Sequence, residues 1–434
     1  MNPLYRNDRQ GVLPDSWYVA STDIPSLRPA LKGQVTGDVC VVGAGYTGLS
    51  AARHLADKGL DVIVLDAHRV GFGASGRNGG QVASGHHTDQ RTLARKLGKD
   101  HAAALWYLSQ EAKSDLRDNC ANHIPEAAYK PGIVHGFYAA GEAQDHRKEI
   151  AFRAQEYGYE QTKLLSPTEM SEIVKSLLYQ GGQLDEGAAH IHPLRYALGL
   201  GRLAEAAGAR ISECSEVHQI DHGDPVTLRT NKGQVKARHV ILAGNGYLPH
   251  IERKVAAKIM PMNSFICATE PLGARAQEVL SRDVAVEDSK FVVNYYRLSE
   301  DGRLLFGGRP SYSIGFPDDM SSALRQRMCA LFPQLKDVRI DYAWGGSLGV
   351  TMTRMPALIR VAPNVVAAGG YSGQGVALAG IAGKVMAEAV AGQAGRFDTL
   401  ANLNIPNFSG GPAMRAPLLT LAMTWYALRD RLGI

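Results

Sequence analysis

Near the start of the chain, the pattern of apolar and polar positions predicts a strand, a glycine turn, a helix and a second strand. Residues 39–42 form a short apolar run, and residues 43–48 form a glycine-rich turn. Residues 49–58 have the composition of a helix, and residues 60–66 form a second apolar run that ends in Asp66. Short apolar runs on either side of a helix are typical of buried parallel strands. The pattern therefore predicts a βαβ unit.

The turn of this unit has the GxGxxG spacing of a dinucleotide-binding site. Gly43 permits the tight turn, Gly45 lets the backbone approach a pyrophosphate, and Gly48 lets helix and strand pack closely. The start of the helix offers free N–H groups and a positive dipole to the phosphates. Asp66 stands where a carboxylate bonds a ribose hydroxyl, which favours an unphosphorylated adenosine. A glycine turn alone is weak evidence, but strand, helix and acid in register predict that the chain binds a dinucleotide.

Two further apolar strands end in glycine turns much later in the chain. Residues 239–242 run into the turn 243–246, and residues 365–368 run into the turn 369–375 and a small-residue helix. Between them, residues 260–344 are rich in β-type sequence and predict a separate antiparallel sheet. Insertions therefore interrupt the dinucleotide-binding domain.

The predicted fold class is α/β (α+β overall), with a Rossmann-like domain and an interleaved antiparallel-sheet substrate domain. A length of 434 residues agrees with two intertwined domains. We expect the dinucleotide-binding domain at residues 35–90, 190–260 and 345–395, the substrate-binding domain at residues 91–189 and 261–344, and a C-terminal extension with an amphipathic helix at residues 396–434.

The composition, with 45% hydrophobic and 21% charged residues, is typical of a globular protein. The net charge of +5 is spread along the chain, which disfavours nucleic acid as a partner. Five cysteines lie far apart without CxxC spacing, which argues against a zinc site or a disulfide framework and fits a reducing cytoplasm.

The ends of the chain carry no strong membrane or export signal. The polar residues 1–10 predict no secretory signal. No run approaches the ~20 apolar residues of a spanning helix. Residues 416–432 predict an amphipathic helix packed on its own domain or on a partner subunit, with peripheral membrane contact as the alternative.

Three strand-to-glycine approaches, hundreds of residues apart, suit one large and deeply buried cofactor. A nicotinamide enzyme usually needs only two consecutive mononucleotide halves, whereas FAD reaches from an adenosine site into a second domain. A helix that begins after Gly375 would direct N–H groups at the flavin edge where negative charge accumulates on reduction. The alternative for residues 369–375 is an ordinary tight connection between strand and helix. The sequence favours FAD.

Three segments resemble a known family. They are residues 73–81, the Trp-Gly-Gly of residues 344–346, and residues 370–375. The tail from residue 410 onward is also similar. On these segments the chain resembles the D-amino-acid oxidase, glycine oxidase and sarcosine oxidase superfamily of FAD-dependent amine oxidoreductases, and within it the gamma-glutamylputrescine oxidase-like proteins. The resemblance implies an FAD-binding domain of the glutathione-reductase and D-amino-acid-oxidase type.

The resemblance also implies which residues bind FAD, held non-covalently. The turn after the first strand would face the pyrophosphate, Asp66 the ribose, Glu216 and Val217 the adenine, and residues 370–375 the flavin head. The implied cofactor-binding residues are Gly43, Ala44, Gly45, Tyr46, Thr47, Gly48, Asp66, Ala67, Gly73, Ala74, Ser75, Arg77, Asn78, Gly79, Gly80, Gln81, Val217, Ala243, Gly244, Gly370, Tyr371, Ser372, Gly373, Gln374 and Gly375.

In enzymes of this family the carbon that bears the amine gives a hydride equivalent to flavin N5, and the resulting imine is hydrolysed. The catalytic and substrate-side candidates are Tyr296, Arg309, Arg354 and Tyr371. Strand alternation sends Tyr295 to one face of its strand and Tyr296 to the other. His86 and His87 lack matching carboxylate or cysteine ligands, so we expect a loop role and no metal.

Two departures from the family narrow the substrate. Glycine oxidase-like members carry a carboxylate-binding arginine just after the Trp-x-Gly segment, and residues 344–349 contain none. This favours gamma-glutamylputrescine or a related polyamine derivative over the alternative, a secondary amino acid such as L-pipecolate, proline or sarcosine. The oxygen-activating lysine of sarcosine oxidases is also absent from residues 291–309, so the electron acceptor is O2 or another molecule. A flavin-binding protein without turnover and a nicotinamide-only dehydrogenase are the remaining alternatives.

Overall fold

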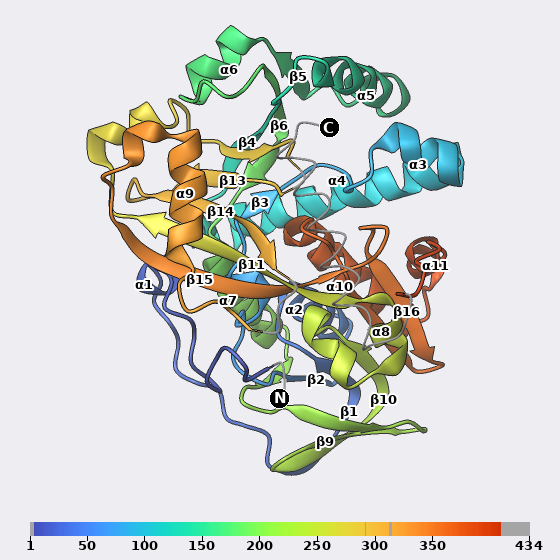
Figure 1. The fold of residues 1–434 in the computed structure, drawn as a ribbon. Helices are drawn as coiled ribbons and strands as arrows, with labels where there is room; N and C mark the ends of the chain where they lie inside the picture. Colours follow the sequence, from blue (N-terminus) through green and yellow to red (C-terminus); the bar gives the residue numbers. More distant parts are fainter. Residues whose placement is uncertain (1–3, 291, 312–314, 409–434) are drawn as a thin grey trace.

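The computed structural model describes residues 4–290, 292–311 and 315–408, which fold around two large sheets (Figure 1). The two sheets contain segments that alternate along the chain, because each sheet takes strands from the first, middle and last thirds of the sequence. The predicted fold class is confirmed: a mainly parallel sheet with helices lies beside a mainly antiparallel one.

The first sheet has the strand order β16-β17-β10-β1-β2-β7, and β9 and β8 extend it beside β10. The five strands from β17 to β7 are parallel, and β16 and β9 run antiparallel to their neighbours. The strands are β1 (Gly33–Val42), β2 (Val62–Leu65), β7 (Arg210–Ser212), β8 (Val217–Asp221), β9 (Val226–Thr230), β10 (Gly233–Leu242), β16 (Ala357–Ala362) and β17 (Val365–Gly369). The predicted strand–turn–helix–strand unit is β1, α2 and β2.

The second sheet has the order β15-β11-β14-β13-β12-β4-β6-β3, with β5 beside β6. Only β12 and β4 are parallel neighbours. The strands are β3 (Gln81–Val82), β4 (Lys130–Gly136), β5 (Thr162–Leu165), β6 (Gly182–His190), β11 (Met260–Thr269), β12 (Ala285–Asp288), β13 (Tyr295–Leu298), β14 (Leu304–Ser311) and β15 (Ile340–Val350). The β-rich segment predicted at residues 260–344 supplies five of them and also contains a helix.

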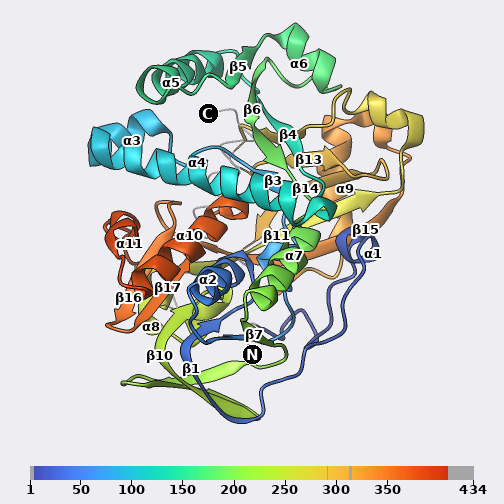
Figure 2. The same cartoon turned by 180° about the vertical axis from the view of Figure 1, so that it is seen from behind.

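Helices cover both sheets. Figure 2 shows α2, α7 and α10 in front of the first sheet and the long α4 crossing above them. The helices are α1 (Trp17–Ala20), α2 (Tyr46–Ala56), α3 (Gln90–Leu97), α4 (Lys99–Asn122), α5 (Glu142–Tyr157), α6 (Pro167–Ile173), α7 (Pro193–Ala206), α8 (Arg253–Lys258), α9 (Ser321–Leu331), α10 (Gly375–Val390) and α11 (Gly395–Ala401).

The largest core lies between the first sheet and these helices. Val39, Cys40 and Val41 of β1 are fully buried in it, as expected for a central parallel strand. Residues from α4 belong to the same core and α4 packs on α10, although we assigned residues 91–189 to the substrate domain. A second core lies between the antiparallel sheet and α9. The domain boundaries stay a prediction.

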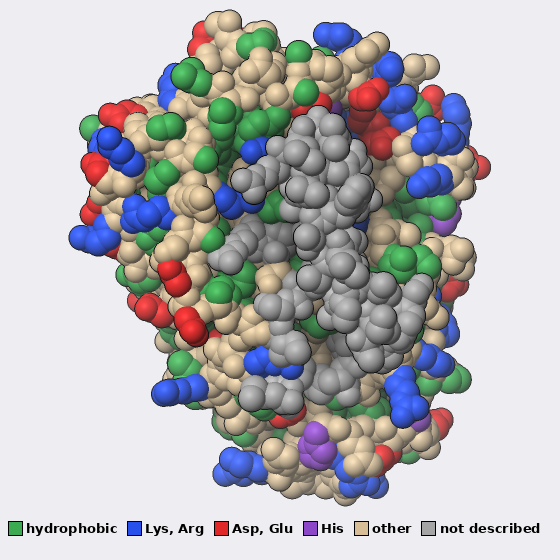
Figure 3. All heavy atoms as spheres, in the orientation of Figure 1, with side chains coloured by type: hydrophobic (Ala, Val, Ile, Leu, Met, Phe, Trp, Pro, Cys, Tyr) green, Lys and Arg blue, Asp and Glu red, His purple; other side chains and the backbone are tan. Residues whose placement is uncertain are grey.

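The surface of the described residues carries charges of both signs. In Figure 3, Lys and Arg side chains are interspersed with Asp and Glu over the visible face. No helix in the described ranges is long and apolar enough to span a bilayer. The predicted amphipathic helix at residues 416–432 lies outside the described residues.

Candidate cofactor and substrate site

A cavity of about 670 Å³ lies where the carboxyl ends of the parallel strands meet the antiparallel sheet. Gly43, Asp66 and Ala243 line it from the ends of β1, β2 and β10, and Ser264 and Tyr295 line it from β11 and β13. Ligands of open α/β sheets bind at the carboxyl ends of the strands. Its size is within the range of cofactor sites.

Backbone approaches too close for a side chain shape the first part of the cavity. Gly43 has a φ of +107°, and a Cβ there would lie 2.9 Å from the backbone of Ala243. A Cβ on Gly48 would lie 1.9 Å from the carbonyl oxygen of Gly43, so only glycine lets α2 start this close to β1. A Cβ on Gly45 would lie 2.8 Å from Ser75 Oγ. The tight turn at Gly43 and the close packing at Gly48 are as their spacing predicted, and the approach of a pyrophosphate to Gly45 stays a prediction.

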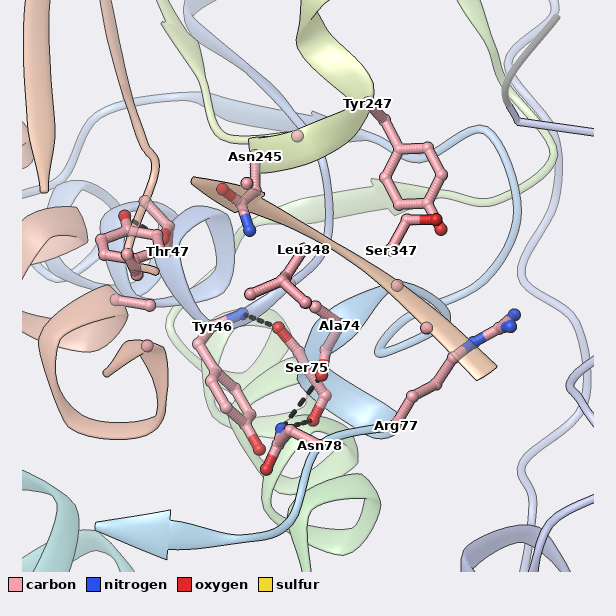
Figure 4. A pocket seen from close by; sticks show the side chains of 18 of the residues that line it. Tyr46, Thr47, Ala74, Ser75, Arg77, Asn78, Asn245, Tyr247, Ser347 and Leu348 are labelled. Atoms are coloured by element: carbon pink, nitrogen blue, oxygen red, sulfur yellow. Dashed lines mark hydrogen bonds between the residues drawn. The ribbon is translucent and has the colours of Figure 1, made fainter. Parts of the chain in front are cut away.

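The glycine-rich loop after β2 is held in shape by its own side chains (Figure 4). The backbone N–H of Tyr46 donates to Ser75 Oγ at 3.1 Å, and the Asn78 amide donates to the carbonyls of Ala74 and Ser75. The Arg77 guanidinium donates to the carbonyls of Phe72 and Gly345 and pairs with Asp8. Arg77 therefore ties the loop to β15 and to the N-terminal segment.

Asp66, for which the sequence predicts a bond to the ribose, directly follows β2 and lines the cavity. Its carboxylate accepts hydrogen bonds from the backbone N–H groups of Ala44, at 2.7 Å, and His68, at 2.8 Å. Burial raises the pKa of Asp66 to about 6, although these two hydrogen bonds act to lower it and the nearby Glu213 acts to raise it. The carboxylate lines the cavity beside Glu216 and Val217.

The N-terminal segment contacts the part of the chain around Asp66 and contributes to the cavity wall there. Leu4 lines the cavity, and its carbonyl bonds to His68 Nε2 at 2.9 Å. The Tyr5 hydroxyl donates to the Glu216 carboxylate at 2.7 Å. Asp8 pairs with Arg77. These contacts hold the N-terminal segment against the residues that line the cavity.

The turn between β17 and α10 forms another part of the cavity wall. Gly370, Ser372 and Gly373 have φ values of +72°, +53° and +102°, which turn the chain sharply before α10 begins. The N–H of Gly370 donates to Asn245 Oδ1 at 2.9 Å, and the Tyr371 hydroxyl lies 2.7 Å from Thr47 Oγ1. The first residues of α10 therefore line the cavity, where the backbone N–H groups at the start of a helix can donate to a ligand.

Most of the predicted cofactor-binding residues line this one cavity; the four that do not are Ala44, Gly48, Gly80 and Gly370. Ala44 donates to Asp66, and Gly48 packs on Gly43. Gly80 has a φ of +81° and lies against the carbonyl of Ile191. These residues do not line the cavity themselves, but they position the neighbouring residues that do.

The catalytic candidates separate into two groups. Arg354 and Tyr371 line the cavity. Tyr296 does not: its ring packs in the second core and its hydroxyl lies 3.1 Å from that of Tyr179. The choice of Tyr296 was wrong because strand alternation turns its neighbour Tyr295 to the cavity. Arg309 lies on β14, and its side chain is outside the described part of the structure.

Tyr295 packs on glycines of two other elements. A Cβ on Gly79 would lie 2.9 Å from its ring, and a Cβ on Gly307 would lie 2.1 Å from it. Its hydroxyl lies 3.1 Å from Ser264 Oγ. Strand alternation was the sequence signal for Tyr295.

Sequence analysis missed several of the residues that line the cavity, and three of them are polar residues of particular interest. Asn245, His87 and Glu287 all line the cavity. His87 directly follows the glycine-rich loop, which was a signal for its position, and we assigned it only a loop role. Glu287 lies on the four-residue strand β12, whose pattern carries no signal. Among the described residues, no three His, Cys, Asp or Glu side chains form a metal-binding group.

The comparisons with known proteins agree with this site. The family model DAO, described as FAD dependent oxidoreductase, matches residues 38–389. The chain is 40% identical to gamma-glutamylputrescine oxidoreductase of Escherichia coli (strain K12) over 96% of this chain and 99% of that protein. It is 40% identical to the probable oxidoreductase OrdL of Rhizobium meliloti (strain 1021), over 96% of this chain and 97% of that protein. The crystal structure of glycine oxidase from Geobacillus kaustophilus superposes with a TM-score of 0.69 at 20% identity, over 83% of this chain and 95% of that one.

FAD is the cofactor, and the residues present fit it. The cavity has positions at Gly43 and Gly45 where a side chain would collide with the neighbouring chain. It also offers a buried carboxylate at one end and a helix start at the other. These are the features that a dinucleotide with an electron-accepting ring requires.

We predict that Gly45→Val abolishes FAD retention, because the new side chain fills the space between the α2 turn and Ser75. Asp66→Ala should weaken FAD binding by only about 1–3 kcal/mol, the scale of a lost hydrogen bond to a charged group. The flavin-to-protein absorbance ratio and FAD titration of stripped protein measure both. Gly141→Val is the control, since Gly141 is exposed and a Cβ there meets nothing within 4 Å. Full FAD occupancy in the Gly45 variant would contradict the assignment.

We predict that Asp66 makes the FAD-free protein less stable as pH rises. Its pKa of about 6 exceeds the value of 3.8 of the unfolded chain, so the folded state binds this proton more tightly. The contribution is fully present below pH 3.8 and is lost as pH rises through 6. Asp66→Asn should therefore gain about 1–3 kcal/mol of unfolding free energy relative to wild type between pH 4 and pH 7. Urea unfolding measures the difference, and a difference that does not change with pH would refute this.

Proposed function

We propose that this chain, which belongs to the DAO family of FAD-dependent oxidoreductases, oxidises a carbon–nitrogen bond of gamma-glutamylputrescine or a related polyamine derivative. The observation that carries the proposal is the 40% identity to the Escherichia coli gamma-glutamylputrescine oxidoreductase over nearly the full length of both chains. The family itself makes the chain an FAD-dependent oxidoreductase.

We assign the cofactor contacts by the geometry of the cavity. Gly43 and Gly45 would face the pyrophosphate, and Asp66 would accept a hydrogen bond from the ribose. Val217 would lie against the adenine, and the residues from Gly373 onward would face the flavin head with the start of α10. Bound FAD supplies the acceptor for the hydride equivalent that leaves the carbon next to the amine nitrogen.

The substrate side of the cavity would orient and desolvate the amine. Tyr295 holds its ring over the glycine-rich loop, and Ser264 fixes its hydroxyl. Met262, Val293 and Leu348 give this part of the cavity an apolar lining. Burial in such surroundings disfavours the ammonium form of an amine, and only the neutral amine releases a hydride.

The alternative substrate, a secondary amino acid, is not favoured. The solved structure of L-proline dehydrogenase from P. horikoshii shares only 20% identity with this chain, and a likeness at that level shows the fold alone. The electron acceptor in this proposal is O2 or another small molecule.

Anaerobic mixing tests the proposed function. Gamma-glutamylputrescine should bleach the flavin absorbance of the purified protein within seconds, and L-pipecolate, L-proline and sarcosine should leave it unchanged over the same time. Admitting O2 afterwards, with peroxide detection, then distinguishes an oxidase from an enzyme with another acceptor. Bleaching by an imino acid and not by gamma-glutamylputrescine would overturn the proposal.

We predict that Tyr295→Phe lowers kcat/KM by about 3- to 10-fold, the effect of one hydrogen bond lost at a site of turnover. Its matched control is Tyr296→Phe, which removes the hydroxyl contact with Tyr179 in the second core. That variant should lose about 1 kcal/mol of unfolding free energy and keep its kcat/KM. Steady-state kinetics and thermal unfolding separate the two, and equal kinetic losses would contradict the orientation of this strand.

A further inference from the structure

We propose that Glu287 and Arg354 form a subsite that binds an ammonium and a carboxylate carried on one carbon, at the end of the substrate that is not oxidised. The inference rests on the proposed function, because it names the group that the amine substrate carries at its far end. The amino-acid end of a gamma-glutamyl amide is such a zwitterion.

Cross-strand register places Glu287 on the cavity face of the antiparallel sheet. Glu287 of β12 pairs with Tyr295 of β13 on one side and with His135 of β4 on the other. Side chains of directly paired residues lie on the same face of a sheet. Since Tyr295 and Glu287 both line the cavity, this row of side chains leads along the wall from the reaction site toward β4.

His135 holds the Glu287 carboxylate in position. Its Nδ1 lies 3.3 Å from Glu287 Oε1, and this is the hydrogen bond that Glu287 makes among the described residues. Burial alone would raise the pKa of Glu287, but the hydrogen bond and the charge of His135 bring it below the usual value. The carboxylate thus stays charged inside the cavity and keeps an oxygen for a ligand.

Arg354 reaches the same region from the loop between β15 and β16. It has a φ of +56°, an uncommon conformation for a side chain of this size, which persists where surrounding structure holds it. Its guanidinium donates to His87 Nε2 at 3.2 Å. Both Arg354 and His87 line the cavity.

His87 connects the two charged residues. Burial first and the Arg354 charge second lower the pKa of His87 to about 4, against the opposing charge of Glu287. His87 is therefore neutral at pH 7, and it lies within electrostatic reach of a fixed cation and a fixed anion. A ligand group that carries one charge of each sign matches this arrangement better than a simple amine or a simple acid.

The chemistry of oxidation also separates Glu287 from the reacting amine. A carboxylate beside an amine favours its ammonium form, and that form cannot release a hydride. An ammonium group at the far end of the substrate has no such restriction and gains a charge-assisted hydrogen bond. Glu287 is therefore better suited to bind the ammonium group at the far end of the substrate than the amine that is oxidised.

Two substrates with the same reacting amine test the subsite. Gamma-glutamylputrescine carries the zwitterion, whereas N-acetylputrescine replaces it with a neutral methyl group. Glu287→Gln should lower kcat/KM for gamma-glutamylputrescine by about 10- to 100-fold, mainly through KM, and change it less than twofold for N-acetylputrescine. Arg354→Gln should show the same selectivity. Glu186→Gln, which changes an exposed glutamate paired with Arg282, is the control.

Binding of gamma-glutamyl-n-butylamide, which keeps the zwitterion and lacks the reacting amine, provides a second readout through the flavin difference spectrum. Glu287→Gln and Arg354→Gln should each weaken this binding at least tenfold. Equal losses for both substrates, unchanged kinetics, or equal binding of the butylamide would overturn the subsite. Failure of the wild type to oxidise any amine would refute the proposed function alone, since the butylamide titration would still decide the subsite. If Glu287→Gln or Arg354→Gln lacks FAD or does not fold, the same measurements on the other variant test the subsite.

Discussion

The whole site depends on close backbone contact around the turn after β1. Gly48 lies against the carbonyl of Gly43, and the backbone of Ala243 lies against Gly43 itself. Helix α10 contacts α2 where Gly383 meets the carbonyl of Thr47. None of these contacts leaves room for a Cβ. They bring three distant segments of the chain together, and the cavity lies beside these contacts. Apolar strands and helices elsewhere mainly hold this meeting point in place.

This dependence explains how much of the molecule could be predicted from the sequence. Close contacts demand glycine, and buried parallel strands demand apolar runs, so the unit from β1 to β2 and the turns at residues 243–246 and 369–375 were recognisable. The antiparallel sheet was recognisable as a region, but α9 within it was not. Tyr296 and Tyr295 differ only in the face they occupy, and one pattern of alternation does not say which face meets the cavity. Glu287 owes its place to register with β4 and β13, a long-range relation that local sequence does not contain.

The two halves of the cavity use charge in opposite ways. Around the glycine turns, backbone N–H groups and helix starts offer partial positive charge without any mobile side chain, which suits a permanently bound anionic cofactor. On the antiparallel sheet, full charges stand on Glu287 and Arg354 with neutral His87 between them. Side chains such as these can be exchanged in evolution without disturbing the backbone contacts. A fold of this kind thus keeps its cofactor while changing the molecules on which it acts.

The walls of the cavity come from segments between Leu4 and Ala379, with Phe408 beyond them. During synthesis on the ribosome, the first nine-tenths of the polypeptide must emerge before the pocket exists, although the β1–α2–β2 unit is complete within the first 66 residues. The complete flavin pocket therefore forms only once the Tyr371 loop has met Thr47. A ligand that binds the folded chain and not the unfolded one stabilises the fold, so a cell short of riboflavin would accumulate this chain in a less stable form.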